Sequence, residues 1–121
     1  MSYMLLIIEP VGQRATRTEA EGREAYAVMQ RFAEGLAAQG KLKAVESLAS
    51  QAQAVRISHA GGKPQTLDGP FAEAKEMIGG FFLLQNVTHE EAIAAAHACP
   101  AAQWATVEVR ALAPCFDESH A

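Results

Sequence analysis

Cysteine, clustered basic residues and long apolar runs are all scarce in this 121-residue chain, and each scarcity excludes a class of protein. The two cysteines, Cys99 and Cys115, are too few for a disulfide scaffold and form no CxxC pair, so we expect a reducing, cytoplasmic setting. No apolar run approaches the length that spans a bilayer, and the first one ends at Glu9 and Pro10. We therefore expect no membrane association.

Charge and motif content exclude further classes. The formal net charge is −4, and the basic residues are scattered from Arg14 to Arg110 rather than clustered as a nucleic-acid surface requires. No two histidines have the HxH or HxxxH spacing of a metal site, and neither a GxSxG motif nor a glycine-rich phosphate loop occurs. We expect no nucleic-acid partner, no metal and no cofactor.

The rest of the sequence, half of it hydrophobic, alternates between strand-like and helix-like patterns. Capping boxes at 18–21 and 88–91 predict the starts of two helices, which end near Gly40 and Ala98. Strands are predicted over 3–8, 41–48, 54–58, 65–67, 81–85 and 104–110.

This order predicts an α+β fold, a ferredoxin-like split βαβ sandwich in which both helices cover one face of an antiparallel sheet. We assign it to a single domain over residues 1–112, followed by a polar tail over 113–121. The strands at 3–8 and 81–84 are apolar on both faces, so the second face of the sheet needs a cover. A second copy of the chain is the simplest cover, and we expect a homodimer joined sheet to sheet.

Two stretches carry a specific family signal. Residues 67–87, LDGPFAEAKEMIGGFFLLQNV, and residues 97–110, HACPAAQWATVEVR, resemble the YCII-related family in its DGPF-domain branch. The resemblance implies a dimeric α/β barrel and says little about a reaction. Genes of the DGPF type often lie beside genes for extracytoplasmic-function sigma factors, so it also implies a sigma factor as a candidate partner.

The sequence departs from the family pattern in two places. Family members commonly have tyrosine where Phe81 and Phe82 stand, so a hydroxyl role there is absent. No histidine precedes His59, so the pairing of an acid with a histidine proposed for other YCII-related proteins has no counterpart near the N-terminus.

The DGPF stretch itself supplies candidate site residues. The Asp68 carboxylate either bonds backbone N–H groups of the Gly69-Pro70 turn, or acts as a general base held at the mouth of a cleft. Phe71 either packs in the core or forms a pocket wall beside Gly69 and Pro70, which then contact the substrate.

A mixed charge cluster of Glu73, Lys75 and Glu76 follows the turn. These residues are either solvated surface pairs or the lining of a cleft between subunits. In the second case Lys75 holds an anionic substrate, Glu73 contacts it and Glu76 moves a proton.

Three other residues complete the candidate set. His97, near the end of the second helix, is either a half-buried structural residue or an acid/base group. Arg56 on the hairpin and Arg110 on the last strand form either surface ion pairs or substrate contacts. Gly79 and Gly80 are expected to serve a bulge or a close backbone approach.

The favoured interpretation is a dimer that binds or acts on a small polar molecule by acid/base chemistry in a cleft near the DGPF loop. Asp68, Lys75, Glu76 and His97 are its candidate catalytic residues. The alternatives are a regulatory or binding module that acts with a sigma factor, and a dimeric scaffold whose DGPF loop only shapes the fold.

Overall fold

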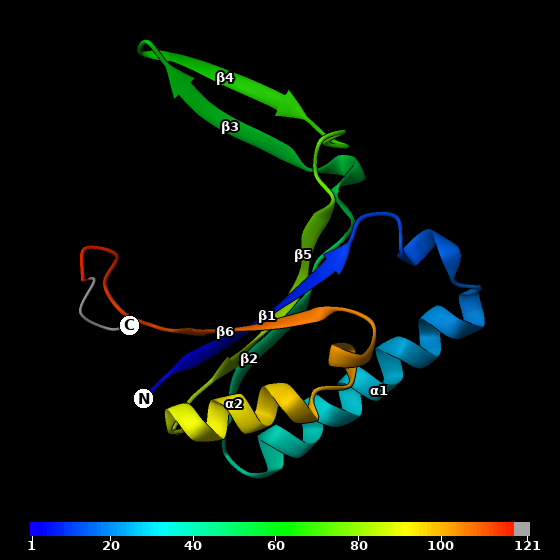
Figure 1. Cartoon of the computed structure of the whole chain (residues 1–121), viewed down its shortest axis with the longest axis vertical. Coiled ribbons are helices and arrows are strands. Elements are labelled where there is room, and N and C mark those ends of the chain that lie inside the picture. Colours follow the sequence, from blue (N-terminus) through cyan, green and yellow to red (C-terminus); the bar gives the residue numbers. More distant parts are fainter. Residues whose placement is uncertain (118–121) are drawn as a thin grey trace.

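The computed structural model describes residues 1–117, which form one four-stranded antiparallel sheet, a separate hairpin and two α-helices (Figure 1). In chain order the elements are β1 (Tyr3–Pro10), α1 (Glu19–Ala38), β2 (Leu42–Ser47), β3 (Val55–Ala60), β4 (Lys63–Asp68), β5 (Glu76–Leu84), α2 (His89–Ala98) and β6 (Thr106–Ala111). Short 3₁₀ helices lie at Arg14–Thr16, Gln51–Gln53 and Pro100–Gln103. No helix of this part of the chain has the length and apolarity needed to cross a membrane.

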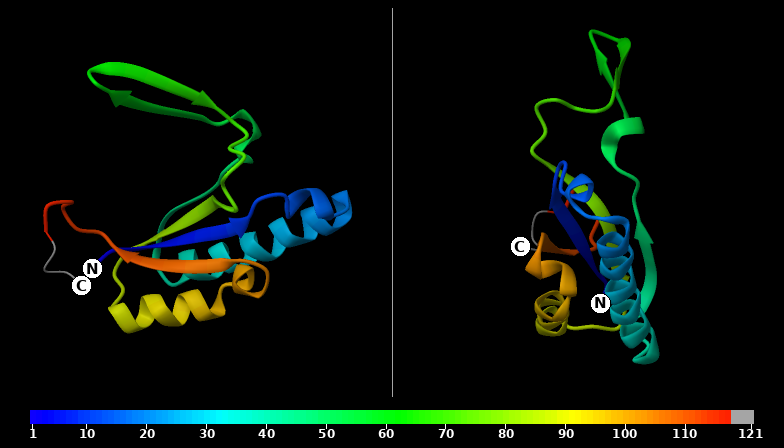
Figure 2. Two further views of the ribbon diagram at one scale, coloured as in Figure 1. Left: turned by 45° about the horizontal axis from the view of Figure 1, so that its top comes forward. Right: turned by 90° about the vertical axis from the view of Figure 1, so that its right-hand side faces the viewer.

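The strand order β2-β5-β1-β6 places β5 between β1 and β2, which α1 connects, so this unit is a split βαβ. Both helices lie on one side of this sheet and the β3–β4 hairpin lies on the other (Figure 2, left). The arrangement is consistent with the predicted ferredoxin-like α+β fold. Assembly of two such units into a dimeric barrel stays a prediction.

Both predicted capping boxes are present. The Thr18 hydroxyl accepts from the backbone N–H of Glu21 at 3.1 Å, and the Glu21 carboxylate accepts from the N–H of Thr18 at 2.8 Å. Thr88 and Glu91 make the same two bonds at the start of α2. Each box satisfies backbone N–H groups that the first turn leaves without a helical partner, and this is why the helices begin where the sequence predicts.

The core lies between the helices and the sheet. On β1 the odd-numbered residues from Tyr3 to Glu9 are buried, whereas Met4, Leu6 and Ile8 on the opposite face are only partly buried. The buried core consists of Tyr3, Leu5, Ile7, Ala33, Leu36, Phe82, Leu84, Val87, Ala92, Cys99 and Ala101. Phe32 of α1 meets Phe82 edge to face at 5.3 Å between ring centroids, which joins the helix layer to the sheet.

Each observed strand differs from its predicted boundaries by one or two residues, except that β5 begins five residues earlier than predicted. The strand predicted from residue 81 begins at Glu76, so Gly79 and Gly80 lie inside β5, where the register with β1 shifts between Ile7 and Ile8. The last strand begins at Thr106 instead of residue 104, because the preceding 3₁₀ turn ends at Trp104. A bulge was one of the two roles expected of the glycine pair, and the register shift opposite Gly79 is consistent with it.

Candidate functional site

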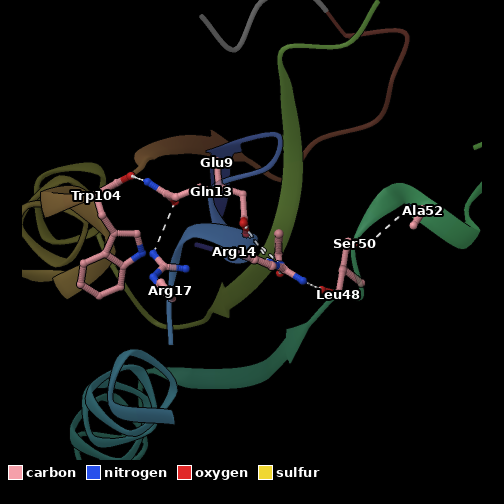
Figure 3. Close-up of polar contacts among 9 residues, drawn as sticks. Glu9, Gln13, Arg14, Arg17, Leu48, Ser50, Ala52 and Trp104 are labelled. Carbon is pink, nitrogen blue, oxygen red and sulfur yellow. Dashed lines mark hydrogen bonds and ion pairs between the residues drawn. The ribbon is translucent and has the colours of Figure 1, made fainter. Parts of the chain in front are cut away.

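A cleft of about 620 Å³ lies between α1 and the helix-facing side of the sheet, which is within the size range of small-molecule pockets. Its walls are largely apolar and include Ile7, Met29, Ala33, Leu42, Val45 and Phe82. Polar and aromatic groups from β1, the following 3₁₀ turn and the segment before β6 gather near Glu9 (Figure 3). An apolar cleft with a few placed polar groups is the usual form of a ligand site.

The principal polar feature is an ion pair between Glu9 and Arg14. Arg14 Nε donates to Glu9 Oε2 at 2.9 Å and Arg14 Nη2 donates to Glu9 Oε1 at 2.8 Å, a bidentate arrangement. The remaining donor, Nη1, bonds the Leu48 carbonyl at 2.8 Å, and Nη2 also lies 3.3 Å from the Gly79 carbonyl. The pair therefore ties β1 to β5 and to the end of β2.

Gly79 makes room for this pair. A Cβ added at Gly79 would overlap Glu9 Oε1 and lie 3.0 Å from Arg14 Nη2. Because glycine has no side chain, the Glu9 carboxylate can lie directly against the β5 backbone at Gly79. Such a close approach is expected of a glycine within a strand. The GG of the DGPFAEAKEMIGG stretch thus lines the cleft, although its DGPF end does not.

A second cation, Arg17, lies beside Trp104 in the same cleft. Its guanidinium carbon is 5.7 Å from the centre of the Trp104 ring, and Nη2 donates to Gln13 Oε1 at 3.4 Å. Gln13 Nε2 in turn donates to the Trp104 carbonyl at 2.7 Å, which fixes the orientation of the amide. Two neutral groups therefore hold Arg17 in place without neutralising its charge.

Comparison with known proteins matches residues 1–115 to the YCII-related domain. The protein belongs to the YCII-related family. An uncharacterized protein of Rhizobium meliloti (strain 1021) is 36% identical over 71 residues, which cover 59% of this chain and 54% of that relative. The similarity thus spans about half of the relative's length. The family predicted from residues 67–87 and 97–110 is confirmed, and its DGPF branch stays a prediction.

The DGPF loop of this YCII-related protein lies away from the cleft, at the base of the hairpin (Figure 1). Asp68 is exposed at the end of β4, and no hydrogen bond to its carboxylate occurs within the described residues. The role of Asp68 in bonding the turn, one of its two predicted roles, is therefore not seen. The Gly69 N–H donates to the Ala54 carbonyl at 2.7 Å, and the Gly69-Pro70 bond is cis.

Phe71 is buried, but it packs beneath Arg56 and outside the main core. The Arg56 guanidinium carbon lies 3.8 Å from the centre of the Phe71 ring, a close cation–π contact. Arg56 and Glu76 also line a second, shallower cleft of about 370 Å³ on the other face of the sheet. Gln51 lines it too, and its buried Nε2 has no hydrogen-bond partner within residues 1–117. The structure thus brings together three of the predicted residues, because Arg56 contacts Phe71 and shares the shallower cleft with Glu76.

The other predicted residues are dispersed. His97 is exposed in the last turn of α2 and not half-buried as predicted, because α2 packs through Ala92 and its neighbours. Arg110 pairs with Glu108 two positions earlier, at 3.3 Å on the exposed face of β6. Glu73 and Lys75 are exposed before β5, where the Lys75 carbonyl accepts from the Val11 N–H. Within one described chain, the four predicted catalytic side chains do not share a cleft.

Metal and thiol chemistry have little support in the described part of the chain. Residues 1–117 contain no group of three or more histidine, cysteine or acidic side chains that could hold a metal ion. Cys99 is buried behind α2, where burial raises the pKa of its thiol, and Cys115 is exposed and remote from the cleft. A raised pKa keeps Cys99 in its unreactive neutral form.

Glu9, Arg14 and Arg17 are not among the site residues predicted from the sequence, although the pattern on β1 contains a signal for Glu9. Tyr3, Leu5 and Ile7 alternate along the strand, and Glu9 continues that alternation toward the buried side. A carboxylate at a core-facing position needs a partner, and Arg14 is the first cation after it in the sequence. Trp104 carried no comparable signal, because only the fold brings it beside Arg17.

Proposed function

We propose that this YCII-related protein binds a small organic molecule in the cleft between α1 and the sheet. The observation that carries the proposal is the form of the cleft, which is of ligand size, apolar along its walls and supplied with fixed polar groups near Glu9. The Glu9–Arg14 pair supplies a fixed polar group at the cleft, since the Glu9 carboxylate is buried, Arg14 is partly exposed, and both lie against Gly79, where any Cβ would displace them.

Two matched glycine variants test this proposal. Gly22 lines the cleft, and a Cβ there meets no atom within 4 Å, so a side chain added at this position starts without a clash and extends into the cleft. Gly35 lies on the exposed face of the same helix and is equally free of contacts. Leucine at either position raises helix propensity by up to about 1 kcal/mol, so neither variant is expected to unfold.

The measurement is a thermal-shift screen of a metabolite library against wild type, Gly22→Leu and Gly35→Leu. We expect ligands that raise the melting temperature of wild type and Gly35→Leu but have little effect on Gly22→Leu. Ligands that stabilise all three proteins equally bind elsewhere, and that result would reject the cleft as the site.

A second candidate function is acid/base chemistry on a small molecule in the shallower cleft near the DGPF loop. It is favoured by the unpartnered Gln51 Nε2, the free Asp68 carboxylate and the presence of Arg56 and Glu76 in the shallower cleft. A ligand that still binds Gly22→Leu but is lost in both Asp68→Asn and Glu76→Gln would support it. Action with a sigma factor remains an expectation from the family resemblance, for which co-purification is the test.

A further inference from the structure

Arg17 and Arg56 differ from the other arginines of the described chain in how their charge is balanced. Of the six arginines, four pair with a carboxylate within the described residues. These pairs are Arg14–Glu9, Arg23–Glu19, Arg31–Glu24 and Arg110–Glu108. The two without a carboxylate, Arg17 and Arg56, both lie over an aromatic ring. Arg17 alone of these two lines the large cleft.

The acids near Arg17 are already engaged. Glu9 is bound by Arg14, and the Glu19 carboxylate accepts from Arg23. Glu21 is near enough to Arg17 for an electrostatic interaction. Its carboxylate is already engaged, because it accepts from the Thr18 N–H in the capping box. Within the described chain, no carboxylate oxygen lies within 4.0 Å of the Arg17 guanidinium.

A half-buried guanidinium held by neutral groups suits a planar anion. Arginine binds carboxylates through two parallel N–H bonds, and such bonds are strong where water is partly excluded. The apolar walls of the cleft, including Met29 and Phe82, would accept the rest of such a ligand. Glu34 of α1 also lines the cleft, and its carboxylate disfavours a second anionic group.

We propose that the ligand of the cleft is a monocarboxylic acid with an apolar body, whose carboxylate is bound by Arg17 beside Trp104. This inference rests on the proposed function, because it names the class of molecule that the same cleft would take. Trp104 and Gln13 then act as positioning residues, which hold the guanidinium toward the cleft.

The test compares two probes of nearly equal shape, 1-naphthoic acid and the neutral 1-naphthamide, by isothermal titration calorimetry. We expect wild type to bind the acid at least about tenfold more tightly, because a hydrogen bond between two charged groups is stronger than one to a neutral amide. Arg17→Gln should bind the two probes equally, and Arg17→Lys should retain part of the preference. Arg23→Gln, which removes an exposed guanidinium already paired with Glu19, should retain all of it.

The outcomes separate this inference from the proposed function. Equal binding of acid and amide by wild type, no binding of the acid at millimolar concentration, or a preference that survives Arg17→Gln would each overturn the inference. If Gly22→Leu still weakens binding of the probes, they occupy the cleft, and the proposed function stands without the carboxylate inference. Should Gly22→Leu leave their affinities unchanged, the probes bind outside the cleft and the inference fails, whereas the proposed function is judged by the metabolite screen.

Discussion

At the scale of single residues, the Glu9 carboxylate occupies the space in which any other residue at position 79 would place its Cβ. The alanine side chain of Gly79→Ala therefore has to displace Glu9 or Arg14. Breaking a buried ion pair costs about 3 to 5 kcal/mol, and the partial exposure of Arg14 reduces that figure. We predict that Gly79→Ala lowers the free energy of unfolding by about 2 kcal/mol or more, measured by urea denaturation.

A double-mutant cycle with Glu9→Ala isolates the cause of that loss. If the clash with the pair is responsible, Gly79→Ala should cost much less in the Glu9→Ala background than in wild type. Equal costs in the two backgrounds would mean that the glycine serves only the backbone of β5. Gly35→Ala, on the exposed face of α1, is the matched control and should be neutral or stabilising.

At the scale of elements, the helix starts were predictable because capping boxes are local. Thr18 with Glu21, and Thr88 with Glu91, satisfy backbone groups three residues apart, so four sequence letters suffice to recognise each start. The start of β5 was not predictable in this way. The exposed Glu76 resembles a loop residue, and pairing of this strand with the end of β1 is a long-range contact.

The candidate site, like the start of β5, depends on long-range contacts and could not be predicted from local sequence. The DGPF stretch was predicted to supply the site, and only its terminal glycines reach the large cleft. Arg17 and Trp104 are 87 positions apart and meet only because the fold brings the segment before β6 against the turn after β1. A local motif identifies the family, whereas the cleft depends on tertiary contacts that no short stretch encodes.

The capping box of α2 makes a prediction for acid pH. The N–H of Thr88, and then the side chain of Lys41, lower the pKa of Glu91 below its ordinary value of 4.5. A carboxylate whose pKa is lowered by folding stabilises the folded state above its unfolded pKa, and this contribution is lost as the pH falls through the lowered value. We predict that Glu91→Gln is less stable than wild type at pH 7 and that the difference shrinks below pH 4.5.

Glu90→Gln is the control for that experiment. Glu90 is an exposed neighbour in the same turn, and it forms no hydrogen bond or ion pair within residues 1–117. Glu90→Gln should change the free energy of unfolding little. Its difference from wild type should be the same at pH 7 and at acid pH. A pH-independent gap for Glu91→Gln would show that the glutamine loses packing or geometry instead of charge.

At the scale of the whole molecule, the sheet has one covered face and one open face. Residues that alternate with the core on β1 and β5 point away from the helices, and they include Met4, Leu6, Ile8, Phe81 and Leu83. The hairpin β3–β4 lies on the same side of the sheet, and all of its residues are exposed (Figure 2). An isolated two-stranded hairpin is marginally stable, so it also gains from a covering surface.

We propose that a second copy of the chain covers this face, and we predict that sedimentation at micromolar concentration gives twice the 12.9 kDa mass of one chain. Leu83→Glu places a charge in the middle of the apolar surface, and burying an unpaired charge costs several kcal/mol, so this variant should sediment as a monomer. Ala94→Glu, on the exposed side of α2, should remain dimeric. A monomeric wild type, or a Leu83→Glu dimer as stable as wild type, would contradict the sheet-to-sheet assembly and leave the open face to another partner.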